Sequence, residues 1–499
     1  MSRGSGRAVD VVDGELLRPL LVLALPIVAT NLLQVGYNLA DTFWVGRLGQ
    51  AAVSALSFSW AIVFLVIGLS AGFSVAGTVL VAQNTGAGNT DRVDHVAGQT
   101  IAFVVGLSAL FSVVGYLLAP TMLDLIGAVP GTAEYRLSIE YTRTIFLGIP
   151  FVFSFFVFQG LLQGWGDTRT PLYLMTFGVV LNVVLDPFLV LGFRDNVLFS
   201  TLGLSGIETA LYGATGFAGF GVQGAALATI LSRGLGAAIA IALLVTGRVG
   251  VNPALPDFRP RRDTVAKIVR IGAPASIEQS TRALGVALVT ALVAIAGQEA
   301  VAGYGIGNRL TSLVFLPAIG LARGTETVVG QNLGADQPDR ARRAVYASVA
   351  LIAGVLVVVS AVVVALATSI TAVFITGANA DAVVGIGADY LRIVGPTFAL
   401  LGAFRVVQGG FRGSGSTTTA MAFSILALLV LRVPAAYALV RSGAGATGVW
   451  WAIALSNVLA LVAAGAWFLR GDWTDGVVDP DATPGPPVDP AVSADDGDD

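Results

Sequence analysis

The sequence predicts an all-α integral membrane protein with twelve transmembrane helices. They are expected to form two six-helix bundles, an N-lobe and a C-lobe, related by a pseudo-twofold axis along the membrane normal. The first observation is composition: 55% of the residues are hydrophobic and 12% are charged, whereas a soluble domain carries about 25% charged residues. The second is a repeat of half the chain, which is typical of proteins built from two equivalent membrane bundles.

The repeat rests on landmarks that recur in the same order without a gap. Pro26 in the first half has its counterpart in Pro274 of the second. Two further pairs of motifs follow: Gln83-Asn84-x-Gly86 with Gln331-Asn332-x-Gly334, and Gln163-Gly164-x-Gly166 with Arg412-Gly413-x-Gly415. The repeated unit is therefore half of the protein, and the two copies point the same way across the membrane.

Twelve apolar segments are long enough to cross a bilayer, whose hydrocarbon core of roughly 30 Å needs about 20 residues of helix. Six lie in each half, at residues 17–38, 52–72, 96–118, 141–162, 171–191, 220–245, 269–296, 300–321, 345–367, 388–411, 420–440 and 448–469.

Charge and composition divide the chain into five parts. They are a polar N-terminal segment (1–15), the N-lobe (16–246), a linker rich in proline and arginine (247–267), the C-lobe (268–470) and an acidic tail (471–499) that is expected to be disordered. Most loop arginines fall on the side that holds both termini, so the positive-inside rule predicts cytoplasmic termini and a multi-pass protein of the plasma membrane. The loop from Arg194 to Gly219 is expected outside and has no counterpart in the C-lobe.

Several kinds of chemistry are excluded. The chain has no cysteine and a single histidine, His95, so disulfides, thiolate metal sites and multi-histidine metal sites are ruled out. No Gly-x4-Gly-Lys-Ser/Thr motif occurs, which excludes a P-loop ATPase. The acidic residues of the helices are not clustered as an enzyme that binds magnesium diphosphate requires. We expect no enzyme activity, no cofactor and no nucleic-acid partner.

Two pairs of polar residues stand out inside the apolar segments. Tyr37 and Asp41 lie four residues apart in the first segment, and Asn182 and Asp186 lie four apart in the fifth, before Pro187. That spacing puts each pair on one helix face. A carboxylate at membrane depth is costly and usually faces a functional cavity. The alternative is that both carboxylates cap helix ends near the interface.

Together the two pairs suggest a cation pocket. Two neighbouring carboxylates cannot both ionise cheaply in a dry cavity, so the pair is expected to hold a proton or a monovalent cation. Carboxylate and amide oxygens suit Na⁺, whereas Asp41 beside Tyr37 suits a proton relay. The sequence leaves these two ions open.

At these residues the chain resembles the multidrug and toxic compound extrusion (MATE) family. The scarcity of lysine and the acidic tail suggest a halophilic archaeal source, and simple codon bias is the alternative. The motifs are Leu25-Pro26, Tyr37-Asn38-Leu39-Ala40-Asp41-Thr42, the two Gln-Asn-x-Gly segments, Gln163-Gly164-x-Gly166-Asp167-Thr168 and Asn182-x-x-x-Asp186-Pro187. The resemblance implies an antiporter that exports small amphipathic or cationic organic compounds in exchange for H⁺ or Na⁺ by alternating access, as a monomer in the lipid bilayer.

The resemblance also implies roles for individual residues. Asp41, Asn182 and Asp186 match the family's cation-binding positions, joined by Tyr37 and Thr229. The expected substrate cavity includes Gln34, Gln159 and Met175. Pro26 interrupts the first helix, which is expected to bend there; a static kink is the alternative.

The second half offers a weaker candidate and a competing function. Glu278 is a second-rank cation ligand, but Arg282 lies four residues later, which favours a structural ion pair. Arginines on the predicted C-lobe helices also suit a flippase of lipid-linked oligosaccharides, which is the alternative function. In the repeat, Asp41 aligns with Val289 and Asp186 with Ala435. We therefore expect ion coupling in the N-lobe alone.

Overall fold

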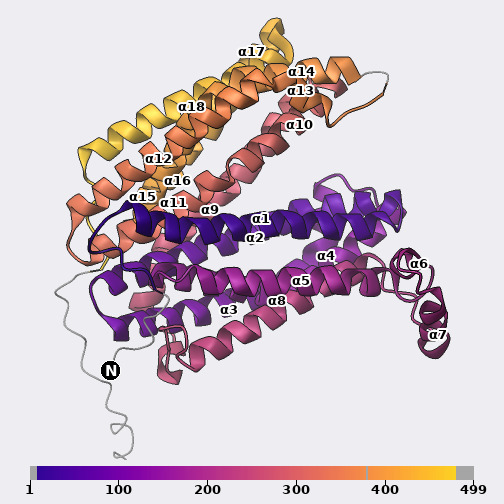
Figure 1. The fold of residues 1–499 in the computed structure, drawn as a ribbon, viewed down its shortest axis with the longest axis horizontal. Helices are drawn as coiled ribbons and strands as arrows, with labels where there is room; N and C mark the ends of the chain where they lie inside the picture. Colours follow the sequence, from indigo (N-terminus) through magenta and orange to yellow (C-terminus); the bar gives the residue numbers. More distant parts are fainter. Residues whose placement is uncertain (1–7, 378–379, 479–499) are drawn as a thin grey trace, which may run out of the picture.

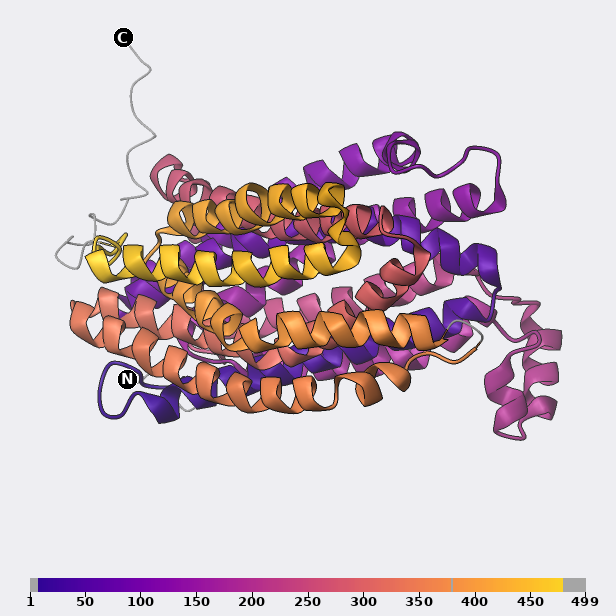
Figure 2. The same cartoon turned by 90° about the horizontal axis from the view of Figure 1, so that it is seen from above.

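A computed structural model describes residues 8–377 and 380–478, and within these residues the chain forms helices and no strand. The helices lie in two groups along the length of the molecule (Figure 1). Both ends of the described chain lie at one end of the bundle, opposite the short helices α6 and α7 (Figures 1 and 2).

The N-lobe contains six long helices. They are α1 (Leu17–Gly46), α2 (Gln50–Gly86), α3 (Thr90–Leu125), α4 (Ala133–Trp165), α5 (Arg169–Leu191) and α8 (Val222–Val245). Polar side chains start two of them, since Asn89 accepts a hydrogen bond from the Arg92 amide and Thr132 from the Tyr135 amide. Gly166 ends α4 in the left-handed conformation (φ 95°), which glycine adopts at no steric cost.

The C-lobe repeats this plan with more breaks. Its elements are α9 (Arg262–Ala294), α10 (Gln298–Val314), α11 (Leu316–Gly334), α12 (Pro338–Ala365), α13 (Ala367–Ala372), α14 (Ala380–Val394), η2 (Gly395–Thr397), α15 (Phe398–Gly413), α16 (Thr417–Ile425), η3 (Leu426–Arg432), α17 (Val433–Leu439), η4 (Val440–Ala444) and α18 (Gly445–Arg470). The elements η3 and η4 are π-helical turns.

The described residues hold twelve membrane crossings. Ten helical stretches are long and apolar enough to span a bilayer, and α10 with α11, bent by 41° at the break between them, makes an eleventh. One stretch, Thr417–Arg470, has 54 residues, far more than the roughly 20 that a bilayer requires. Gly443 interrupts it with a φ of 89°, so it crosses twice. The predicted fold class is confirmed.

Two connecting segments differ from the prediction. The linker was expected to reach residue 267, but α9 already begins at Arg262, and η1 (Leu255–Phe258) is the remaining ordered turn. The long loop after α5 folds into α6 (Val197–Thr201) and α7 (Ser205–Thr215). Asn196 ties this loop to α5, because its side chain donates to the carbonyls of Pro187 (2.9 Å) and Gly192 (2.8 Å).

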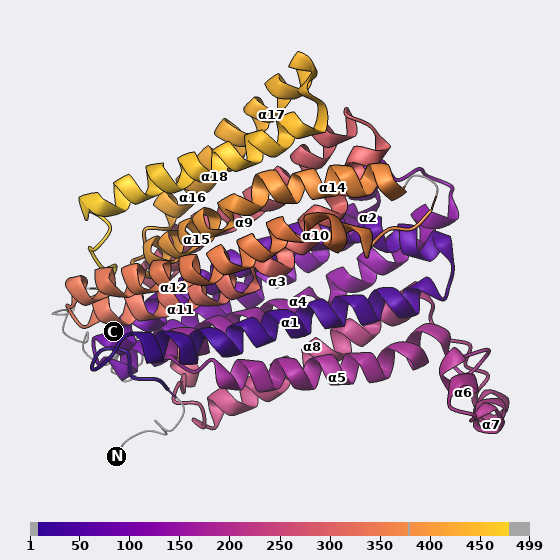
Figure 3. The ribbon, with the colours of Figure 1, turned by 45° about the horizontal axis from the view of Figure 1, so that its top comes forward.

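One helix of each lobe packs into the core of the other. Leu20, Leu23 and Ala24 of α1 belong to the C-lobe core, and Figure 3 shows this part of α1 beside α11 and α12. Correspondingly, Ile268 and Ile271 of α9 belong to the N-lobe core. The lobes are therefore coupled through the first halves of α1 and α9.

Four segments join the lobes at the end of the bundle where the described chain begins and ends. We call them the seam: residues 83–86, 164–166, 331–334 and 413–415. Gln83 Nε2 donates to the Gly413 carbonyl (3.1 Å), and Gln331 Nε2 donates to the Gly164 carbonyl (2.8 Å). A Cβ on Gly86 would lie 1.8 Å from the Gln331 carbonyl oxygen. Only glycine allows this approach.

Both described ends of the chain are bound at the seam. The Val9 amide donates to the Gly166 carbonyl (3.2 Å), and Asn332 Nδ2 donates to the Val11 carbonyl (3.1 Å). At the other end, the amides of Val477 and Val478 donate to Gln83 Oε1 (2.7 and 3.1 Å).

The acidic tail, expected to be disordered from residue 471, is therefore ordered over residues 471–478. The tail is acidic on average, but its first residues include apolar side chains that pack on the C-lobe. Trp473 is 2% exposed and stacks on Phe468. Residues 479–499, and residues 1–7 of the N-terminal segment, lie outside the described part of the chain.

Candidate functional site

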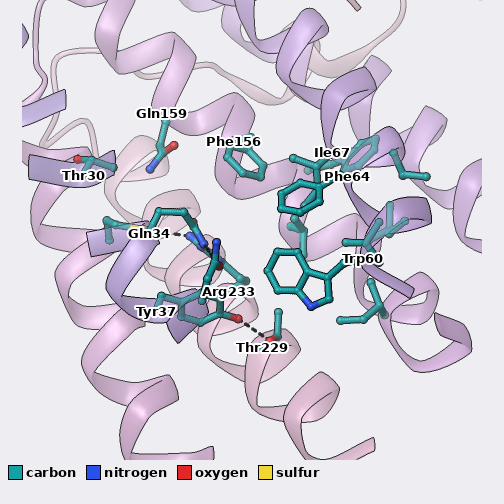
Figure 4. A pocket seen from close by; sticks show the side chains of 18 of the residues that line it. Thr30, Gln34, Tyr37, Trp60, Phe64, Ile67, Phe156, Gln159, Thr229 and Arg233 are labelled. Carbon is teal, nitrogen blue, oxygen red and sulfur yellow. Dashed lines mark hydrogen bonds between the residues drawn. The ribbon is translucent and has the colours of Figure 1, made fainter. Parts of the chain in front are cut away.

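The N-lobe encloses a cavity of about 180 Å³ between α1, α2, α4, α5 and α8. Aromatic side chains form much of its wall, and Figure 4 shows Trp60, Phe64 and Phe156 facing Tyr37 and Arg233 across it. Such a surface suits flat, amphipathic ligands, because apolar and aromatic walls bind them with few directional contacts.

Five of the predicted residues line this cavity: Gln34, Tyr37, Gln159, Met175 and Thr229. They come from four different helices, so the fold brings together residues that are far apart in the sequence. The Tyr37 hydroxyl and the Thr229 hydroxyl lie 2.5 Å apart and share a hydrogen bond, which joins α1 to α8. Gln34 Nε2 donates to Asn38 Oδ1 (2.9 Å) on the next turn of α1.

The predicted carboxylates are buried next to the cavity and do not line it. Asp41 is 1% exposed, and Asn182 and Asp186 are both fully buried. Asp41 lies inside α1, which continues to Gly46, so it does not cap the following loop. Asp186 likewise lies inside α5, and Asn182 Nδ2 donates to its Oδ1 (3.3 Å).

Several oxygens of this group make no hydrogen bond within the described part of the chain. They are both carboxylate oxygens of Asp41, Oδ2 of Asp186 and Oδ1 of Asn182. Buried polar atoms in proteins are almost always partnered. The charges of Asp41 and Asp186 act on each other and on Tyr37. The group therefore offers buried carboxylate and amide oxygens, which are the ligands that a proton or a hard cation requires.

Two residues of the site were missed from the sequence. Tyr141 of α4 lines the cavity and lies within the fields of Asp41 and Asp186. Arg233 of α8 donates to Gln34 Oε1 (2.5 Å) and its guanidinium lies over the rings of Tyr37 and Phe155, 5.3 and 4.9 Å from their centroids. The signal for Arg233 was present, because it is the only charged residue within the apolar segment 220–245.

Glu278 lies in a different environment. It is 1% exposed and pairs with Arg282 and with Arg412, whose Nη1 lies 3.0 Å from Glu278 Oε1. Arg412 also pairs with Glu326 (3.0 Å). This arrangement favours the structural ion pair over a cation site at Glu278.

No cluster of three or more His, Cys, Asp or Glu side chains that could hold a metal ion occurs in the described ranges. A single bound cation at the Asp41 group would instead share its ligands with amide and hydroxyl oxygens.

A model of one protein family matches the chain twice, over residues 26–188 and 274–438, under the description MatE. The chain belongs to the MatE family. The two matches fall on the two lobes, which confirms the repeat. Members are membrane transporters, so this MATE chain is a multidrug efflux-type transporter and not an enzyme.

Relatives of this MATE chain extend over most of its length. "Probable multidrug resistance protein YoeA" of Bacillus subtilis is 28% identical over 432 residues, which cover 85% of this chain and 86% of the relative. "FAD transporter" of Shewanella oneidensis is 26% identical over 335 residues, which cover 67% of this chain and 69% of that relative. A solved structure described as the outward-facing conformation of a multidrug resistance MATE family transporter is 25% identical with a TM-score of 0.82, covering 95% of this chain and 99% of that one.

Proposed function

We propose that this MATE transporter is a secondary antiporter that exports amphipathic or cationic organic compounds in exchange for H⁺ or Na⁺. Ion coupling is assigned to the N-lobe group of Asp41, Asn182, Asp186, Tyr37 and Thr229. The names of the relatives support the multidrug part of this proposal. The ion-coupling part is the proposal of this work.

The observation that carries it is the pairing of two features in one lobe. Buried carboxylate oxygens that have no hydrogen-bond partner among the described residues lie beside a cavity with an aromatic wall. Tyr37 belongs to both, because it lines the cavity and lies in the fields of Asp41 and Asp186. Ion binding and substrate binding would therefore both act on α1, either by competing for the same side chains or by shifting the helix.

The test is export of a fluorescent cationic dye from proteoliposomes, with the pH gradient and the sodium gradient varied independently. The wild type should respond to one gradient. Asp41→Asn should lower coupled export more than about tenfold, equivalent to about 1.4 kcal/mol. Asp195→Asn is the matched control, because Asp195 is exposed in the loop before α6. Unchanged coupled export in Asp41→Asn would contradict the role of Asp41.

Two variants also distinguish Na⁺ from H⁺ as the coupling ion. A sodium-coupled transporter should bind Na⁺ at constant pH, and the Asn182→Ala variant should weaken that binding because it removes an amide oxygen. A proton-coupled transporter should depend instead on Tyr37, so Tyr37→Phe should reduce export while Asn182→Ala changes it little.

We further propose that the seam lies on the cytoplasmic side of the plasma membrane, with both termini inside. The distribution of loop arginines supports this orientation. With the seam closed on the cytoplasmic side, the substrate cavity would open toward the outside. Pro26, which lies within α1, is proposed as the point where α1 bends during the cycle, and the protein is proposed to act as a monomer.

The second candidate function is a flippase of lipid-linked oligosaccharides. Arginines inside the C-lobe favour it, since a pyrophosphate needs several of them. Reconstituted vesicles that contain a fluorescent polyprenyl-linked sugar discriminate the two functions: movement of this lipid without any ion gradient would favour the flippase.

A further inference from the structure

A second cavity lies inside the C-lobe and has the opposite charge. Its volume is about 60 Å³, and its wall combines three arginines with polar and apolar side chains. The polar lining consists of Arg282, Arg405, Arg432, Gln408, Ser424 and Asn457. Among the residues that the structure describes, no acidic side chain lines this cavity.

This cavity is the counterpart of the N-lobe cavity in the repeat. Arg282 follows Pro274 by the same number of residues as Gln34 follows Pro26. Gln408, before Gly409, corresponds to Gln159 before Gly160. Gln34 and Gln159 both line the N-lobe cavity. The duplicated scaffold therefore places a pocket at equivalent positions in both lobes, but the C-lobe pocket is smaller, less aromatic and richer in arginine.

Positive charge exceeds negative charge in this part of the C-lobe. The two buried carboxylates are already paired, Glu278 with Arg282 and Arg412, and Glu326 with Arg412 and Arg323. No carboxylate pairs with Arg405 or Arg432 in the described ranges.

These two arginines, which make no ion pair with a described carboxylate, are held differently. Arg432 donates from Nε to Ser456 Oγ (2.9 Å) and from Nη2 to Asn457 Oδ1 (2.7 Å), so neutral groups orient it. For Arg405, no hydrogen bond or ion pair is formed with any residue that the structure describes. An arginine inside a membrane bundle is costly unless it meets a counter-charge.

The backbone at this cavity is also unusual. Arg432 is the last residue of the π-helical turn η3 (Leu426–Arg432), and Ala427 and Leu428 of the same turn line the cavity. π-helical turns are rare and occur frequently at functional sites. The π-helical turn thus contributes Ala427, Leu428 and Arg432 to the wall of the cavity.

We propose that the C-lobe cavity binds the oxyanion group, phosphate or carboxylate, of an amphipathic substrate through Arg405 and Arg432. Guanidinium groups bind such oxygens through paired, charge-assisted hydrogen bonds. The cavity has about a third of the volume of the N-lobe cavity, which favours a small group such as a head group over a whole amphiphile. The transported class would then include zwitterionic and anionic amphiphiles besides cations. This inference deepens the proposed transport function and rests on it for the fate of the ligand.

The test is equilibrium binding of two probes that differ only in the anionic group, riboflavin and riboflavin 5′-phosphate. Both are followed by fluorescence anisotropy with the full chain in phosphatidylcholine nanodiscs. The wild type should bind the phosphate form more tightly by about tenfold or more, since a charge-assisted contact contributes at least one such factor. Arg405→Gln should abolish the difference. Arg441→Gln, an exposed arginine of the same lobe, should preserve it.

Further measurements separate a binding role from a structural one. Arg405 makes no ion pair with a described residue, so its replacement breaks none. Arg405→Gln should therefore keep or raise the melting temperature, and Arg405→Lys should restore part of the discrimination. Equal binding of the two probes by the wild type would overturn the proposal, as would discrimination that survives in Arg405→Gln.

Two other sources of the anion are also distinguished. Displacement of the probe by inorganic phosphate at equal concentration would show a site for the free anion and overturn the assignment to a substrate. Loss of discrimination in nanodiscs that contain phosphatidylglycerol would show a lipid head group there, with the same consequence. Because binding needs no ion gradient, failure here is separate from failure of the Asp41→Asn transport test.

Discussion

Arg233 gives the N-lobe cavity a fixed positive charge beside two buried carboxylates. Its guanidinium contacts Gln34 and two aromatic rings, so its position in the cavity is well determined. A cationic substrate must enter the same space. Selectivity among cations, neutral compounds and zwitterions would therefore depend on this residue as much as on the carboxylates.

Replacing Arg233 with methionine should favour cationic substrates. The change removes the like charge while methionine retains most of the apolar contact with Tyr37 and Phe155. A cationic dye should bind about tenfold more tightly, because two unit charges within one cavity interact by about one to a few kcal/mol. The affinity of a neutral dye of similar size should not change. Arg47→Met is the control, since Arg47 also lies over a ring, that of Phe43, but is exposed. An equal gain for both dyes would assign the effect to cavity volume.

The charges around Arg412 should matter for stability. Arg412→Met leaves the buried carboxylates of Glu278 and Glu326 with fewer counter-charges, and breaking a buried pair in this way costs about 3–5 kcal/mol. The melting temperature in detergent should fall markedly, and Arg343→Met, on the exposed face of α12, should leave it unchanged. Recovery on adding Glu326→Gln would support the pairing. An unaltered melting temperature would argue against it.

Residue spacing predicted part of the site. The i, i+4 pairs Tyr37–Asp41 and Asn182–Asp186 could be read directly, because each pair lies on one turn of one helix. The family resemblance placed Thr229 in the same pocket, but its contact with Tyr37 joins distant helices and was not predicted. Arg233 was overlooked although it is the only charged residue of its apolar segment, because its partners Gln34 and Tyr37 lie on another helix.

Among the elements, α1 connects the two lobes most directly. Its first turns pack in the C-lobe core through Leu20 and Leu23, while its later turns carry Tyr37 and Asp41. A change of helix direction near Pro26 would alter both regions together. The sequence predicted the twelve helices and the proline, because apolar length and backbone chemistry are local properties. It did not predict the exchange of α1 and α9 between cores, which depends on tertiary packing.

Closure of the seam should depend on its glycines. A Cβ on Gly86 or Gly334 would lie 1.8 or 1.9 Å from a carbonyl oxygen of the opposite lobe, so alanine at either position should hold the seam apart. A single cysteine introduced by Thr327→Cys reports this opening. Thr327 is buried and bonds to the Gln163 carbonyl (3.1 Å), and the chain has no other cysteine.

The labelling rate of this cysteine by a water-soluble maleimide should rise in Gly334→Ala, by about tenfold for each 1.4 kcal/mol by which the closed state is weakened. It should rise further in the double variant Gly86→Ala/Gly334→Ala. Gly106→Ala is the control, because a Cβ there has no atom within 4 Å. Equal labelling in all variants would show that the seam tolerates these methyl groups.

For the whole molecule, the described C-terminal segment should stabilise the closed seam. Ending the chain after residue 470 removes Trp473 and the two amides that donate to Gln83 Oε1. The melting temperature should fall, and Thr327→Cys should label faster, by an amount equivalent to about 1–3 kcal/mol for a buried acceptor left without its donors. Ending the chain after residue 478 keeps these contacts and is the matched control. Identical behaviour of the two truncations would rule out this role for residues 471–478.

The seam has the geometry of a symmetric dimer interface within one chain. Gln83 and Gln331 play the same part toward opposite lobes, as do Gly86 and Gly334, and an isologous contact of this kind uses one surface twice. In a true homodimer, every mutation at that surface would occur in both contacts at once. In this single chain a mutation changes only one of the two contacts, so the unchanged contact can hold the lobes together while the other contact varies. Fusion of the halves therefore allows each lobe to change independently, which is the condition under which one pocket could keep carboxylates while the other gained arginines.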